Sequence, residues 1–211
     1  MTFIVNILHK EFSILIADKQ GTLCDDCNVE IRNPDGSLQT IEVDKIFGLV
    51  NNHLAIAITG GEDCHNYLYD LSNNDDLGNA LIKINHFIER PYGHPICFNN
   101  NNTSFASYFD TSAQSYCCNK FTFGNETSNE LFYGGGHVAR YFSAGSGSRV
   151  AHTPNLLQCI SKLENISEFN LSQIRLIIEE LYNEVSMLDP YVGSRFDLCY
   201  ASMMTDNIWL T

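Results

Sequence analysis

The chain opens with MTFIVNIL (residues 1–8), HKE (9–11) and FSILIAD (12–18). Two runs rich in β-branched and aromatic residues flank a short polar break, a pattern that predicts a strand, a turn and a second strand. Chain ends fray unless something holds them, so a strand that begins at residue 2 would fix this end in a core. The stretch therefore predicts a β-hairpin with a threonine, Thr2, at its start.

Thr2 has a chemical use if Met1 is removed, a common event before a small residue. Its hydroxyl and a free α-amine would then sit on one residue. A hydroxyl is a weak nucleophile until a base takes its proton. An α-amine has a pKa of about 7.7–8.0 and can serve as that base near neutral pH. We interpret Thr2 as a candidate nucleophile, with an ordinary edge strand as the alternative.

Composition limits the class of protein. The 211 residues are 44% hydrophobic, which suits one domain over residues 1–211 with a real core. The net charge of −13 argues against nucleic acid and against an anionic membrane surface as partners, because both need clustered Lys and Arg. No apolar run reaches the length of a membrane span and no signal peptide is present, so we expect a cytoplasmic protein.

Metals and cofactors are not expected. Cys24 and Cys27 have the spacing of half a zinc site, but no second matching pair follows. In a cytoplasmic chain the eight cysteines are expected to be reduced.

The rest of the chain alternates between strand and helix patterns. A second hairpin is predicted over residues 28–43 around the turn NPDGS (33–37). Further strands are predicted at 45–50, 54–58, 115–124, 131–142, 196–203 and 208–210, and residues 91–104 are expected to form a loop. Apolar spacing predicts helices near 67–71, over 77–88, from 154 and over 171–188. This order predicts an α+β domain with two sheets face to face and helix pairs outside.

Several short motifs occur in a fixed order along the chain. After the opening threonine come IAD (16–18) with QGT (20–22), DKI (44–46), TGGED (59–63), AGSG (144–147) and an aspartate at the end of the long helix, Asp189. In this order and spacing they resemble the proteasome β-type subunits. They are most similar to the simpler bacterial proteasome-like peptidase that works with a separate unfoldase. Both belong to the N-terminal-nucleophile hydrolases.

The resemblance implies a four-layer αββα sandwich of two antiparallel sheets flanked by helix pairs, and a threonine peptidase. It assigns roles by motif: nucleophile Thr2, acidic residue Asp18, active-site lysine Lys45, oxyanion-hole glycine Gly60, substrate-binding Thr22, the serine beside the nucleophile Ser146, and Asp189, which steadies that serine and the terminal amine. The chain departs from the family at Val192, where a hydroxyl is usual. It also has extra residues between Leu23 and Asp44.

The resemblance further implies a homo-oligomer such as a ring, a peptide or protein substrate, and an ATP-dependent unfoldase as partner. Two alternatives stay open. One is a small-molecule amidase on the same fold, because a fold does not fix a substrate. The other is a non-catalytic assembly subunit. Taken alone, each assigned residue also fits a structural role, Asp18 as a turn-former and Lys45 as a surface lysine.

Overall fold

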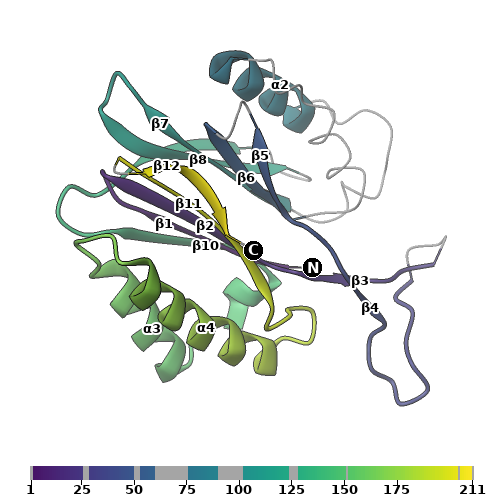
Figure 1. The fold of residues 1–211 in the computed structure, drawn as a ribbon. Coiled ribbons are helices and arrows are strands. Elements are labelled where there is room, and N and C mark those ends of the chain that lie inside the picture. The colour runs from purple at the N-terminus through teal and green to yellow at the C-terminus, as the bar shows by residue number, and fades with distance from the viewer. Residues whose placement is uncertain are drawn as a thin grey trace.

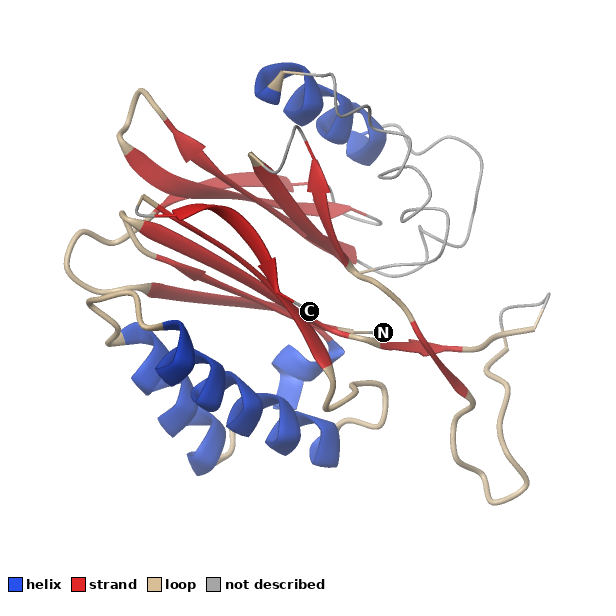
Figure 2. Ribbon diagram, viewed as in Figure 1, coloured by secondary structure: helices blue, strands red, loops and turns tan. Residues whose placement is uncertain are grey.

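The computed structural model describes residues 2–25, 29–49, 53–59, 76–89, 102–123, 128–150, 152–203 and 205–210. Figure 1 shows two large sheets packed face to face, with helices outside them. Figure 2 shows the same view with helices and strands distinguished by colour.

The first sheet is built around the opening hairpin, which the structure confirms. Its strands run in the order β10 (Arg140–Gly145), β1 (Phe3–Leu8), β2 (Phe12–Asp18), β11 (Phe196–Ser202) and β12 (Thr205–Leu210), all antiparallel. Every residue of β1 and β2 is buried. Because side chains alternate along a strand, these two strands serve two cores at once. One set of side chains faces the helices and the other faces the second sheet.

The second sheet is a five-stranded antiparallel meander. Its strands are β5 (Ile46–Leu49), β6 (Leu54–Ile58), β7 (Asn102–Asp110), β8 (Ser115–Phe123) and β9 (Ser128–Tyr133). Residues from both sheets meet in a shared apolar layer that includes Ile4 and Leu15 from the first sheet and Phe105 and Cys118 from the second. Strand β7 falls largely where no strand was predicted, and its first residues lie in the expected loop.

Helices α3 (Pro154–Glu164) and α4 (Leu171–Leu188) cover the outer face of the first sheet (Figure 1). Both start where the sequence predicts. Thr153 caps α3, with a proline at its first position, and the Asn170 side chain accepts a hydrogen bond from Gln173 N at the start of α4. Helix α2 (Leu77–Glu89) lies on the outer face of the second sheet and packs Ala80 and Ile84 against it.

The expected four-layer αββα sandwich with helix pairs on both faces is wrong. The structure is mostly β, with 44% of residues in strands and 27% in helices, and its described residues form three α-helices and three antiparallel sheets. Within the described residues, one face carries the pair α3 and α4 and the other carries α2. The predicted helix near 67–71 lies outside the described residues. The sequence pattern underestimated strand content because β7, NTSFASYFD, is rich in Asn, Ser and Thr, which also favour loops.

The third sheet forms a projecting arm, residues 20–42, of which 26–28 are not described. Strands β3 (Gln20–Thr22) and β4 (Thr40–Glu42) pair at its base, and Figure 1 shows it extending away from the two large sheets. The predicted second hairpin is confirmed only next to its turn at 33–37, where Arg32 and Leu38 form an isolated antiparallel bridge. The extended strand pairing lies nearer the body, between β3 and β4.

Close packing holds Thr2 and Phe3 at the start of β1. The Tyr182 hydroxyl on α4 donates to Phe3 O at 3.1 Å, and the two rings lie 5.1 Å apart. Glycines allow the turn after β10 to lie close to Thr2 and Phe3. A Cβ on Gly147 would lie 2.7 Å from the Phe3 ring, and one on Gly145 would lie 2.0 Å from Thr2 O. Gly145 also has φ of +93°, where a side chain is strained.

We expect Gly145→Ala to be strongly destabilising, because it combines positive-φ strain with a clash against the Thr2 backbone. Its cost should exceed the strain term of about 1–3 kcal/mol in free energy of unfolding. The matched control is Gly36→Ala at the tip of the arm, where φ is +85° but nothing lies within 4 Å. That variant should lose only about 1 kcal/mol. Urea denaturation measures both, and equal losses would contradict the role of the close approach.

Candidate active site

Asp18, the last residue of β2, lies at the centre of a buried polar cluster. Its side chain is fully buried. The Thr2 hydroxyl donates to Asp18 Oδ1, and Phe3 N donates to the same oxygen at 2.7 Å. One carboxylate oxygen thus holds both the hydroxyl of Thr2 and the next backbone N–H, which fixes the position of the Thr2 side chain.

The second carboxylate oxygen of Asp18 faces a cation. Lys45, just before β5, places Nζ 2.9 Å from Asp18 Oδ2 and 2.6 Å from Gln20 O. The lysine side chain is 5% exposed and the aspartate 0%. Burial lowers the pKa of Lys45, and the attraction of Asp18 opposes that effect. The pair joins the two large sheets, because Asp18 ends a strand of the first and Lys45 precedes a strand of the second.

Two backbone donors complete the coordination of Asp18 Oδ2. Gln20 N donates at 3.2 Å and Gly193 N at 3.3 Å. Sequence reasoning missed both. Gln20 lies two residues after Asp18 and could have been inferred from a turn after the strand, but nothing in the sequence links Gly193 to a residue 175 positions earlier.

Ser146 lies beside Thr2, as expected, at the start of the 3-10 helix η2 (Ser146–Val150). Its hydroxyl donates to Thr2 O at 3.4 Å. The structure therefore brings Thr2, Asp18, Lys45 and Ser146 together from four separate segments.

Asp189 and Val192 lie in the loop that leads from α4 to Gly193. Asp189 is buried at the C-terminal end of α4, and its Oδ1 accepts from Tyr191 N at 3.0 Å. Val192 is 2% exposed and packs in the apolar core under the first sheet. The Asp189 carboxylate thus shapes its own loop, and Val192 supplies no hydroxyl beside it.

The two remaining predicted residues differ in outcome. Thr22 lies on β3 in the arm, opposite Thr40, and its Oγ1 is buried without a hydrogen-bond partner among the described residues. Gly60, the predicted oxyanion-hole residue, lies outside the described residues.

The cluster suits activation of a hydroxyl. The Asp18 carboxylate accepts a hydrogen bond from the Thr2 hydroxyl on one side and faces the buried Lys45 ammonium on the other. Among the described residues no group of three His, Cys, Asp or Glu side chains could hold a metal ion. No described helix has the length and apolar character needed to cross a membrane.

Comparisons with known proteins add no family assignment. The chain matches no protein-family model and no curated protein.

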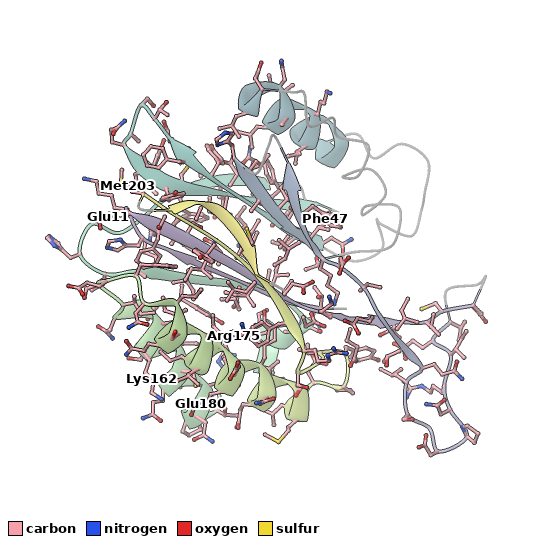
Figure 3. All side chains as sticks on the ribbon, in the orientation of Figure 1. Glu11, Phe47, Lys162, Arg175, Glu180 and Met203 are labelled. Carbon is pink, nitrogen blue, oxygen red and sulfur yellow. The ribbon has the colours of Figure 1, made fainter. Side chains whose placement is uncertain are left out.

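We expect Asp18→Asn to lower the free energy of unfolding by about 3–5 kcal/mol, because it leaves the Lys45 ammonium buried without a counter-charge. The matched control is Glu179→Gln, which breaks the exposed ion pair with Arg175 on α4 and should cost about 0.5 kcal/mol or less. Figure 3 shows Arg175 on α4. Urea denaturation at neutral pH measures both, and a loss as small in Asp18→Asn as in the control would contradict the buried pair.

Proposed function

We propose that the protein is a threonine-type amide-bond hydrolase, a peptidase that uses Thr2 as an N-terminal nucleophile once Met1 is removed. The observation that carries the proposal is the buried line from the Thr2 hydroxyl through Asp18 to Lys45. Burying a hydroxyl, a carboxylate and an ammonium together, away from water, carries a desolvation penalty, so their presence is not explained by stability alone. Their convergence on one threonine favours a catalytic role.

Removal of Met1 supplies the base. While Met1 is attached, Thr2 N is an amide nitrogen and cannot accept a proton. As a free α-amine it has a pKa of about 7.7–8.0. The Lys45 ammonium, held at Asp18 within the same cluster, favours the unprotonated amine through like charge.

The reaction then follows from these groups. The amine takes the proton of the Thr2 hydroxyl as Oγ1 bonds to the substrate carbonyl carbon. The amide C–N bond breaks, and the leaving amine departs with that proton. Water, deprotonated by the same α-amine, hydrolyses the resulting ester and returns free Thr2. Gly60 as oxyanion-hole donor remains a prediction.

Self-association belongs to the proposal. Helices α3 and α4, which form the helix layer, expose large apolar side chains. The exposed fraction is 52% for Leu157, 67% for Leu176 and 75% for Met187. Exposed apolar groups on one layer favour contact with another protein surface. We infer a homo-oligomer such as a ring, served by an ATP-dependent unfoldase and located in the cytoplasm. The small-molecule amidase and the assembly subunit are the outcomes to be separated by experiment.

Lys45→Ala should abolish turnover of a peptide amide while the fold survives, because the charge that tunes the amine is lost. Lys45→Arg should fail as well, since a planar guanidinium does not replace a compact ammonium in a buried site. Lys162→Ala, at an exposed lysine on α3, is the control and should keep full turnover. Circular dichroism verifies folding. Full activity in either Lys45 variant would remove the lysine from the mechanism.

Processing should control activity. Protein that begins at Thr2 should cleave peptide amides and be labelled at Thr2 by a peptide epoxyketone, a reagent that needs the hydroxyl and the adjacent free amine to close its ring. Thr2→Ser should keep part of the activity, because it retains both groups.

Two samples are the controls for processing. Protein that retains Met1 lacks the base and should take no label, and Thr2→Ala lacks the nucleophile. Intact mass reports the label in each case. If homogeneous protein that begins at Thr2 neither cleaves nor labels, the peptidase proposal fails and the assembly subunit becomes the better account. Cleavage of small amides alone would favour the amidase.

A further inference from the structure

A second cluster of charges surrounds Lys19, the residue between Asp18 and Gln20. Its Nζ lies 3.1 Å from Asp197 Oδ1, 3.2 Å from Asp44 Oδ1 and 3.4 Å from Glu42 Oε1. The Lys19 side chain is 19% exposed and that of Asp197 is 15% exposed. One ammonium therefore balances three carboxylates, of which Asp197 is mostly buried while Glu42 is 49% and Asp44 60% exposed.

These carboxylates come from three segments that must meet at the site. Asp197 belongs to β11 in the first sheet, Glu42 ends the arm on β4, and Asp44 immediately precedes Lys45. The only other cation that contacts them in the described part of the chain is Arg195, which lies 2.9 Å from Glu42 Oε2 and is 79% exposed.

The Lys19 backbone makes the same connection. Its N–H donates to Arg195 O at 2.9 Å, and its carbonyl accepts from Val43 N at 2.8 Å. Residue 19 thus joins the strand that ends in Asp18 to the segment that delivers Lys45.

We propose that Lys19 is a positioning residue that holds the segment before Lys45 in place, so that the Lys45 ammonium reaches Asp18 beside Thr2. Its catalytic consequence rests on the proposed function. Asp18 lies before the arm in the sequence and Lys45 lies after it, so the two ends of the arm must be held close together. Ion pairs at the base of the arm close this long loop locally.

Electrostatics makes the role specific to a cation. Burial lowers the pKa of Lys19, but the hydrogen bonds and charges of Asp197 and Asp44 outweigh it and raise the pKa overall. Burial raises the pKa of Asp197; Lys19 opposes that effect, and the charges of Asp44 and Glu42 add to it. Without the Lys19 charge, the three carboxylates repel one another, and Asp44 moves away together with Lys45.

The test measures the accessibility of Lys45 by acetylation with N-hydroxysulfosuccinimide acetate, followed by peptide mass spectrometry and referenced to exposed Lys10. Lys45 is 4% exposed in the intact protein and should be protected. Lys19→Met should raise its relative acetylation rate about tenfold by opening the segment locally. Lys19→Arg keeps the charge and should restore protection. Lys162→Met, at an exposed ion-paired lysine on the helix layer (Figure 3), is the matched control and should change nothing.

A milder variant keeps the test decisive if Lys19→Met does not fold. Asp44→Asn leaves Lys19 paired with Asp197 and Glu42 and removes only the contact next to Lys45. It should raise the acetylation rate of Lys45 less than Lys19→Met does, with an unchanged circular dichroism spectrum. Wild-type protection of Lys45 in every folded variant of Lys19 and Asp44 would overturn the inference.

Catalysis provides a separate measurement on protein that begins at Thr2. Lys19→Met should slow epoxyketone labelling and kcat about tenfold with little change in KM, because a displaced Lys45 affects chemistry more than binding. Lys19→Arg should recover most of the rate. If the wild type takes no label, the proposed function fails, and the acetylation result still decides the role of Lys19.

Discussion

The buried pair of Asp18 and Lys45 constrains the structure more than any other contact. Removing two charges from water costs several kcal/mol for each ion unless their geometry is good and their remaining hydrogen-bonding positions are filled. Here backbone N–H groups from Phe3, Gln20 and Gly193 fill the positions on the carboxylate. The start of β1, the turn after β2 and the loop after α4 must therefore converge on one side chain.

This polar cluster lies at the end of an apolar interior. Strands β1 and β2 are buried on both faces, one against α3 and α4 and the other against the second sheet. Because two closely packed cores hold the hairpin rigidly, the residues at its open end, Thr2 and Asp18, have fixed positions. Tyr182 extends that order by linking α4 to the Phe3 carbonyl. The candidate nucleophile is thus placed by the core and oriented by Asp18.

Local patterns predicted the local features. The first hairpin and the capped start of α4 depend on residues close together in the chain, and both are confirmed. The predicted arrangement of layers was wrong, because Ser, Thr and Asn in β7 hid a central strand, and because Gln20–Thr22 and Thr40–Glu42 pair as a separate sheet. In the candidate site, motif order predicted Thr2, Asp18, Lys45 and Ser146, and the structure brings these four residues together. Gly193 was not, because a backbone donor leaves no mark in its side chain.

The arm has a consequence for how such a chain can change over time. Its two strands pair at the base, close to the charged residues that anchor it, while the turn at 33–37 is open to solvent on all sides. Lengthening a loop costs only about 0.6 kcal/mol for each doubling. Insertions at the tip would therefore leave the distance in space between the side chains of Asp18 and Lys45 unchanged. Descendants of one ancestor could carry arms of very different sizes, and so acquire new binding surfaces, without any change in the cluster of Thr2, Asp18 and Lys45.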